Sequence, residues 1–311
     1  MTTLALAVGA ACAIFARNTH EHALNGSIMP YFLFALIRRL SRMGGIGIVF
    51  AGVIGGLWYW QEGEYRERMS WMGIPEAQQM LDWHTFNRVL RNDGFLVGWS
   101  DLRANPLWVT YRLTRLDAPR HLPRPSGFQR DWRSLWPVAS DDYTRSGYDR
   151  GHMAPNYAIA QVYGRSGQLD TFKMTNVSPQ RPDLNRKVWQ RLEEVVIDHF
   201  VPRFGTVWVM TGPIFDRDIR RMNSLIEIPD AFYKIIVVPS RQPKALAFVI
   251  PQNVTGNEPL DRFLVSIDEV EMRTGLDFFD ELPEEEARRL ESRVDTRGWA
   301  LESVARLPSR Y

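Results

Sequence analysis

The eleven residues SGYDRGHMAPN, at positions 146–156, place three charged or titratable side chains at the edge of an apolar stretch. Asp149, Arg150 and His152 lie within four positions, and glycines and a proline surround them. A solvated loop has no need of the imidazole, and a core strand has no need of the charges, because burying an unpaired charge is costly. The motif therefore predicts either a buried network of ion pairs around a hydrogen-bonded histidine or a functional site.

The composition is that of an ordinary globular protein, with 45% hydrophobic and 24% charged residues among 311. The single cysteine, Cys12, excludes an intrachain disulfide and a cysteine-based zinc cluster. The net charge of +2 is unevenly spread, since residues 120–203 hold 13 basic and 9 acidic side chains, whereas residues 204–311 hold 14 and 18. A positive excess around the motif would suit a polyanionic ligand, but charge alone does not separate this reading from a modest fluctuation.

Residues 44–60, GGIGIVFAGVIGGLWYW, form an uncharged run of 17 residues. Three arginines precede the run and a Trp-Tyr-Trp cluster ends it. Basic residues stay on the cytoplasmic side of a membrane and aromatic residues lie at its interface. We therefore predict a retained single-pass transmembrane anchor, with the following domain outside the cytoplasm: in the periplasm of a bacterium, or in the mitochondrial intermembrane space of a eukaryote. The alternative is a buried glycine-rich helix.

The predicted anchor over residues 44–60 sets the expected boundaries of the rest of the chain. We expect residues 1–43 to be an N-terminal cytoplasmic segment whose natural translation start lies further on, and residues 61–80 to be a polar stalk. A folded domain is expected over residues 81–300, with a tail over residues 301–311.

Alternating apolar residues predict strands over residues 94–100 and 106–113, joined as a hairpin. Three further strands are predicted over residues 206–215, 232–240 and 245–252. Residues 183–200 carry a helical stripe of apolar residues, with Asp183 as a cap. Strands of mixed order with one dominant helix indicate an α+β domain.

A second set of residues on that helix borders its apolar stripe. Asn185, Trp189 and Glu193 are spaced four residues apart, which puts them on one helical face. An amide oxygen and a carboxylate on one face could meet a hard divalent cation. The alternative for Asn185 is a helix-start cap, because it lies in the first turn.

Three segments in order, DRGHMAP (149–155), TNVSPQ (175–180) and LNRKVWQRLE (184–193), closely resemble the DNA/RNA non-specific endonucleases. That family includes secreted bacterial nucleases and mitochondrial endonuclease G. NPLWVTYRL (105–113) and TGLDFF (274–279) are also similar. The resemblance implies the ββα-metal fold, in which a central antiparallel sheet is flanked by helices.

The resemblance also implies residue roles. His152 would be the general base that takes a proton from water, for which an imidazole is well suited near neutral pH. Asn185 would be the single direct protein ligand of Mg²⁺, with Mn²⁺ as a substitute. Glu193 would hold a metal-bound water, and Trp189 would support this face of the helix.

The remaining residues of the motif would support the histidine and the substrate. Asp149 would orient the loop through hydrogen bonds, and Gly151 would let the backbone pass closely. Arg150 would either contact phosphate or brace the motif. An upstream arginine clamps the phosphate in the family, and Arg124 is the expected match, with Arg120 and Arg130 left open.

We therefore predict a metal-dependent phosphodiesterase that cuts DNA and RNA with little sequence preference and leaves 5′-phosphate ends. DNA and RNA are the expected partners, together with the membrane through residues 44–60, while a homodimer and an inhibitor protein are left open. One rival is a nucleic-acid binding or uptake protein with little or no turnover. The other is a structural envelope protein with a degenerate fold.

Overall fold

The computed structural model describes residues 45–216, 218–222 and 224–308. Its main element is a seven-stranded antiparallel sheet in the order β10-β9-β8-β7-β4-β3-β2. The strands are β2 (Arg88–Asn92), β3 (Phe95–Ser100), β4 (Asn105–Thr114), β7 (Thr206–Ile214), β8 (Ala231–Val238), β9 (Lys244–Pro251) and β10 (Leu264–Val265). The predicted hairpin is confirmed as β3 and β4, and the three further predicted strands are confirmed as β7, β8 and β9.

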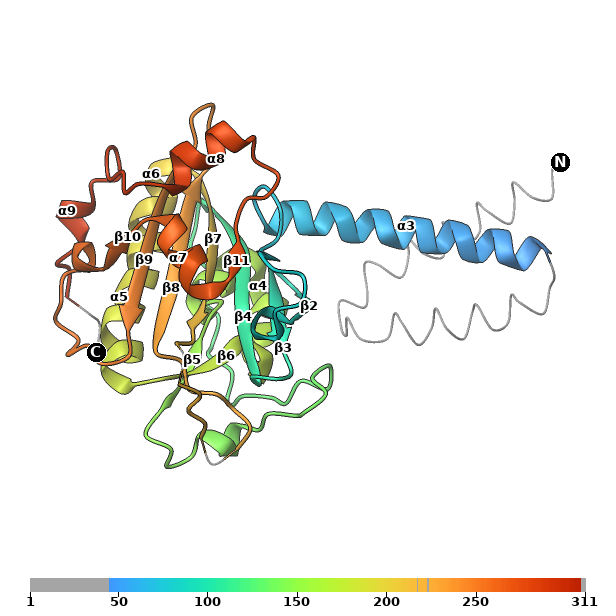
Figure 1. The fold of residues 1–311 in the computed structure, drawn as a ribbon, viewed down its shortest axis with the longest axis horizontal. Helices are drawn as coiled ribbons and strands as arrows, with labels where there is room; N and C mark the ends of the chain where they lie inside the picture. The colour runs from blue at the N-terminus through green and yellow to red at the C-terminus, as the bar shows by residue number, and fades with distance from the viewer. Residues whose placement is uncertain (1–44, 217, 223, 309–311) are drawn as a thin grey trace. The chain divides into compact units, whose positions relative to one another are not determined.

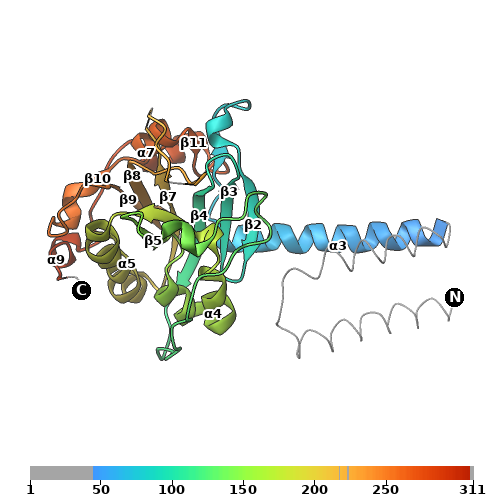
Figure 2. The same ribbon diagram turned by 90° about the horizontal axis from the view of Figure 1, so that it is seen from below.

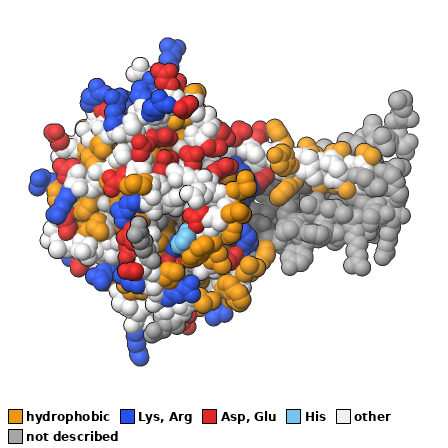
Figure 3. Space-filling model, in the orientation of Figure 1, with side chains coloured by type: hydrophobic (Ala, Val, Ile, Leu, Met, Phe, Trp, Pro, Cys, Tyr) orange, Lys and Arg blue, Asp and Glu red, His pale blue; other side chains and the backbone are white. Residues whose placement is uncertain are grey.

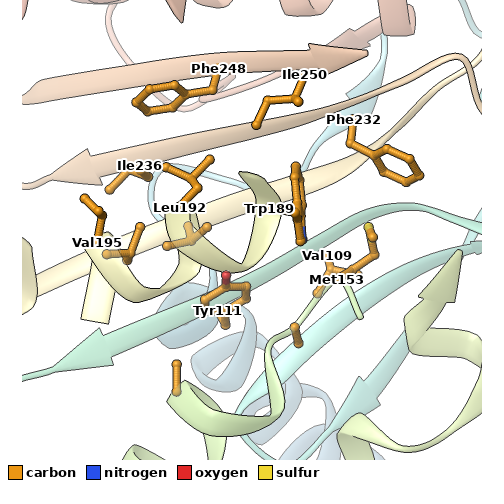
Figure 4. Close-up of a cluster of buried hydrophobic side chains, with 14 of the residues drawn as sticks. Val109, Tyr111, Met153, Trp189, Leu192, Val195, Phe232, Ile236, Phe248 and Ile250 are labelled. Atoms are coloured by element: carbon orange, nitrogen blue, oxygen red, sulfur yellow. The ribbon is translucent and has the colours of Figure 1, made fainter. Parts of the chain in front are cut away.

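Layers on both faces of the sheet explain why its strands read as almost continuous apolar runs (Figure 2). One face is covered by α4 (Asn156–Thr171) and by a long helical segment over residues 184–204. Leu192 and Val195 of that segment pack with Tyr111 and Ile236 of the sheet in one continuous core (Figure 4). This core excludes water from the side of the sheet on which the DRGH motif lies.

The other face of the sheet is covered by α7 (Ile267–Thr274), α8 (Glu284–Glu291) and a small ladder of β1 (Glu76–Ala77) with β11 (Leu276–Asp277). Ser266 caps the start of α7 by accepting a hydrogen bond from the Glu269 backbone N–H, and Gly275 ends the helix in the left-handed region. Short 3₁₀ turns lie at Trp83–Thr85, Ser140–Tyr143, Met174–Asn176 and Leu260–Phe263.

The long helical segment is less regular than its apolar stripe predicts. It comprises a π-helical stretch (Leu184–Trp189), α5 (Gln190–Val195), a second π-helical stretch (Val196–Phe200) and α6 (Val201–Phe204). Wide π turns are uncommon and often occur at functional sites. They also rotate side chains away from the spacing of an ideal helix, so the one-face alignment of Asn185, Trp189 and Glu193 is only approximate here.

Helix α4 was not predicted from the sequence. Its residues YAIAQVYG are rich in aromatic and β-branched side chains, which favour strands. Gly164 interrupts the helix with a φ of 76° and a ψ of −157°. The helix nonetheless forms because Ala158 and Ile159 are buried against the sheet, so tertiary packing outweighs local propensity.

The N-terminal predictions are corrected in part. The uncharged run lies at the start of α3 (Gly45–Met69), except Gly44, which with residues 1–43 lies outside the described residues. No helix among the described residues is long and apolar enough to cross a membrane, so the predicted transmembrane anchor is not supported.

The chain divides into two compact units, one ending at Gly63 and the other beginning at Glu64. Tyr65 and Met69 are buried in the core of the second unit, so part of the expected stalk belongs to the folded unit. The expected tail likewise begins with α9 (Leu301–Val304), whose two end residues are buried.

Strands β5 (Asp149–His152) and β6 (Val177–Gln180) form a separate two-stranded ladder. Figure 1 shows this ladder at one end of the main sheet, with the green segment between β4 and β5 looping beyond it. The ladder therefore presents its side chains where the main sheet ends.

Candidate active site

The β5–β6 ladder leads directly into the long helical segment. Asp149 pairs with Gln180 and His152 pairs with Val177, and the first helical stretch begins at Leu184, soon after β6 ends. This strand–strand–helix unit brings the motif that carries His152 beside the helical turn that carries Asn185.

Gly151 lies directly beneath the side chain of Gln180. A Cβ atom at this position would lie 2.1 Å from Oε1 and 2.6 Å from Cγ of Gln180, a side chain that is fully buried. Only glycine leaves room for Gln180 over this strand, so the motif needs its glycine for packing.

We expect Gly151→Ala to lower the free energy of unfolding by about 1–3 kcal/mol, the usual cost of overpacking a close contact. Gly127→Ala is the matched control, because a Cβ there would meet no atom within 4 Å. The double variant Gly151→Ala/Gln180→Ala should recover part of the loss. Thermal unfolding of the four proteins measures this, and equal melting temperatures for Gly151→Ala and wild type would show that the ladder can absorb the methyl group.

Asp149 holds the first turn of the helix against β5. The amide Nδ2 of Asn185 donates to Asp149 Oδ2 at 3.1 Å, and the Arg186 guanidinium donates to both carboxylate oxygens at 2.7 Å. Burial opposes ionisation of Asp149, but the hydrogen bonds from Arg186 and Asn185 outweigh it and hold its pKa below the usual value. Because Nδ2 faces the carboxylate, Oδ1 of Asn185 points away, and it accepts no hydrogen bond from any described residue.

His152 lies in an aromatic frame. Its ring centroid is 5.1 Å from those of Phe128 and Phe172. The side chain is partly exposed, but its Nε2 atom is buried without a hydrogen-bond partner among the described residues. Burial, together with the nearby charge of Arg124, lowers the pKa of His152 from 6.5 to about 3. The free imidazole is therefore neutral at physiological pH, and the same burial makes it a weaker base than a solvated imidazole.

Two arginines border His152 in different ways. Arg150 donates to the backbone oxygen of Ser140 at 2.6 and 3.1 Å and lies over the Tyr143 ring, so it braces the segment before β5. The guanidinium of Arg124 is exposed and lies over Phe172, 5.1 Å from the ring centroid. Of the three upstream candidates, Arg124 is the one whose charge acts on His152.

The other two upstream arginines, Arg120 and Arg130, do not contribute to the pKa shift of His152. The Arg120 backbone exchanges hydrogen bonds of 2.6 Å with the Gln161 side chain on α4, and its guanidinium lies near Gly164. Arg130 is exposed.

Glu193 points toward the sheet and faces a buried lysine. Lys234 of β8 is fully buried, with Nζ 4.3 Å from the Trp189 ring centroid and 3.5 Å from Thr211 Oγ1. Burial raises the pKa of Glu193, whereas Lys234 and the Trp189 indole N–H lower it. The indole and the carboxylate nevertheless miss hydrogen-bond geometry.

Several buried polar atoms around the ladder and helix have no hydrogen-bond partner in the described part of the chain. Among them are His152 Nε2, Glu193 Oε1, Asn156 Oδ1, and both amide atoms of Gln180. Unsatisfied buried polar atoms are rare, and a group of them points to unseen ligands or waters. Among the described residues, the one trio of His, Cys, Asp or Glu side chains spaced to hold an ion lies elsewhere, at Asp268, Glu271 and Glu291.

A model of the DNA/RNA non-specific endonuclease family matches residues 81–285, about two thirds of the chain. The chain belongs to this family. It is a non-specific endonuclease, of the hydrolase class. The matched range begins where the predicted domain begins and ends before residue 300.

Relatives and a solved structure agree with this assignment of the endonuclease. The "Nuclease" of Serratia marcescens is 32% identical over 205 residues, covering 60% of this chain and 73% of that protein. The human "Nuclease EXOG, mitochondrial" is 33% identical over 174 residues, covering 50% of this chain and 46% of that protein. A chain in the crystal structure of the EndoG/EndoGI complex, a study of EndoG inhibition, matches with a TM-score of 0.61 and 25% identity, covering 71% of this chain and 93% of that chain.

Sequence reasoning about the endonuclease missed the surroundings of its motif residues. Phe128 and Phe172 frame the histidine, Gln180 covers Gly151, and Lys234 faces Glu193. The lysine within the apolar run FYKIIVV was a signal, because a cation inside a buried strand needs a partner.

Proposed function

We propose that this endonuclease is a metal-dependent phosphodiesterase that hydrolyses DNA and RNA at the β5–helix site and leaves 5′-phosphate ends. The observation that carries the proposal is the Asn185 amide: its Nδ2 donates to Asp149 of β5, the strand that also bears His152, while its oxygen accepts no hydrogen bond from any described residue. A proton acceptor and an available amide oxygen on adjoining elements suit metal-assisted hydrolysis of a phosphodiester.

The residues present fit a hard divalent cation such as Mg²⁺, with Mn²⁺ as a substitute. Asn185 Oδ1 would be its direct protein ligand, and the unpartnered Glu193 Oε1 and Gln180 Oε1 are oxygens that could hold ordered waters nearby. When bound, the ion would supply positive charge that stabilises the scissile phosphate and its leaving 3′ oxygen.

His152 would accept a proton from the attacking water. The water oxygen forms the new bond to phosphorus, the bond from phosphorus to the 3′ oxygen breaks, and the 3′ oxygen takes up a proton from solvent. The exposed Arg124 would hold the phosphate beside His152. Arg150 and Asp149 would position the strand and the helix that carry His152 and Asn185.

Little sequence preference is expected, because arginine contacts to phosphate carry no base information. The test is digestion of a plasmid and of a structureless RNA by the full chain in Mg²⁺, with the 5′ ends of the products checked for phosphate. Cleavage of both polymers with 5′-phosphate ends is expected. Binding of both without any cleavage would favour the rival, a nucleic-acid binding protein.

Lys234 gives a prediction about pH. Its positive charge favours ionised Glu193, so Lys234→Met should raise the pKa of Glu193 further. If ionised Glu193 orders water at the site, the acidic limb of the pH–rate profile should move to higher pH in Lys234→Met and vanish in Glu193→Gln. An acidic limb that stays in place in a folded Lys234→Met protein would show that Glu193 does not set it.

We further propose a mitochondrial or secreted location. Several relatives support it by their names, among them "Nuclease 1, mitochondrial" of Schizosaccharomyces pombe and the "Mitochondrial nuclease" of Saccharomyces cerevisiae. Fractionation of cells that express a tagged chain would test it, and an exclusively cytoplasmic signal would contradict it.

A further inference from the structure

We propose that Trp132 and Trp136 form a stacking surface for the unpaired bases of single-stranded nucleic acid. The inference rests on the proposed function, since it concerns how a polymer reaches the same site. We call residues 131–136 the aromatic segment.

The aromatic segment exposes large apolar side chains. Trp132 is 60% exposed, Leu135 is 70% exposed and Trp136 is 57% exposed. The other tryptophans of the nuclease domain are more covered, and Trp99, Trp108, Trp189 and Trp299 are almost fully buried. Exposed apolar patches of this kind commonly mark binding sites. On the face seen in Figure 3, hydrophobic side chains gather in one area, with Lys and Arg side chains beside them.

The backbone of the aromatic segment is held firmly. The buried Asp131 accepts hydrogen bonds from Arg133 at 2.6 Å and from Thr175 Oγ1 at 2.6 Å. Arg133 also donates to Asn92 Oδ1 at 2.7 Å, and the Leu135 backbone N–H donates to Asp101 Oδ1 at 2.8 Å. The exposed rings therefore sit on an ordered support, which lowers the entropy lost when a ligand binds.

Both ends of the surrounding chain meet β5. Before the aromatic segment, Phe128 packs against the His152 ring. After it, the Ser140 backbone oxygen accepts hydrogen bonds from Arg150.

Two hydrogen bonds add a shorter link between the aromatic segment and β5. Asp131, next to Trp132, bonds Thr175, while the backbone N–H of Met153, next to His152, donates to the Asn176 oxygen at 3.0 Å. The segment that bears the tryptophans is therefore joined through Met174–Asn176 to the chain that carries His152.

Charge on the same stretch favours nucleic acid as the occupant. Arg124 and Arg130, which precede the aromatic segment in the chain, are both exposed. Exposed tryptophans and arginines are the side chains that stack on flat bases and attract phosphates. In a duplex the base faces are hidden in the stack, so only an unpaired strand can offer them to the indole rings. The inference is therefore a preference for single strands, made by stacking rather than by base-edge hydrogen bonds.

The test is fluorescence anisotropy with the full chain, in chelator, so that binding is scored without turnover. The probes are a fluorescent phosphorothioate oligothymidylate of about twelve nucleotides, within the usual range of single-strand site sizes, and a duplex of equal length. Trp132→Ala and Trp136→Ala should each weaken single-strand binding about tenfold, and duplex binding less than about twofold. Trp132→Phe should keep most of the affinity. Leu135→Ala, the matched exposed control without an aromatic face, should change it little.

Two results would overturn the stacking surface. Equal losses on duplex and single strand would show that the tryptophans act without regard to unpaired bases. Full affinity in Trp132→Leu/Trp136→Leu would show that apolar area suffices, which would fit a protein-binding surface. If instead single strands bind as expected but neither DNA nor RNA is ever cleaved, the proposed hydrolysis fails and the stacking surface stands.

Discussion

Replacing His152 with alanine should lower the rate of DNA and RNA hydrolysis by about 10²–10⁴-fold, the usual contribution of general acid–base catalysis. The reason is that the neutral imidazole, framed by Phe128 and Phe172, is the proton acceptor of the site. Binding of the single-stranded probe should persist, because the aromatic segment and Arg124 remain. Initial rates at saturating substrate, with circular dichroism to confirm folding, measure the effect.

The same variant should differ from wild type in acid. Burial lowers the pKa of His152 in the folded chain below 6.5. As the pH falls from 6.5 toward 3, His152 is therefore protonated in the unfolded chain but stays neutral in the folded chain. Wild type should therefore lose stability over that window, and folded His152→Ala should lose less. A variant that is folded and cuts at the wild-type rate would remove His152 from the mechanism.

Removing divalent metal should abolish hydrolysis of both polymers while leaving the protein folded. One neutral amide ligand gives modest affinity, so a chelator should strip the ion readily. The core does not depend on it, because the ladder and the helix are joined by the Asp149 hydrogen bonds and by apolar packing. Activity should return with Mg²⁺ or Mn²⁺, measured as digestion rate after dialysis and re-addition.

The acidic trio elsewhere in the domain supplies a control for metal removal. Glu291→Gln removes one of the three carboxylates that lie within 4.8 Å of one another, far along the chain from the β5–helix site. It should leave the dependence of rate on Mg²⁺ unchanged. Full cleavage in excess chelator would contradict the metal mechanism, and a shifted Mg²⁺ dependence in Glu291→Gln would place the required ion at the trio.

Much of the fold could be predicted because its signals are local. Strands β3, β4, β7, β8 and β9 carry alternating or continuous apolar residues, and the helix after β6 carries a clear stripe, so their positions were predicted within a few residues. Strands β2 and β10 of the same sheet were not predicted. Helix α4 was missed because its sequence favours a strand, and only burial against the sheet settles it. The uncharged run over residues 44–60 suggested a membrane span, yet α3 runs on into residues 61–69, which carry Glu and Arg.

The site was predictable in its motif and not in its surroundings. The order of DRGH, TNVSPQ and LNRKVW predicts His152 and Asn185 as site residues, but the contacts around each of them come from chain pairing. No local pattern shows that Asp149 accepts a hydrogen bond from the Asn185 amide, or that Arg150 donates to the Ser140 backbone oxygen. Those contacts depend on which distant segments the sheet and helix bring together.

The dependence of hydrolysis rate on Mg²⁺ concentration in Asn185→Ala, beside wild type, tests the central claim most directly. The methyl group cannot coordinate an ion, so the folded variant should stay near the chelated rate on both DNA and RNA at Mg²⁺ concentrations that saturate wild type. An unchanged Mg²⁺ curve in folded Asn185→Ala would contradict the account and remove Asn185 from the site.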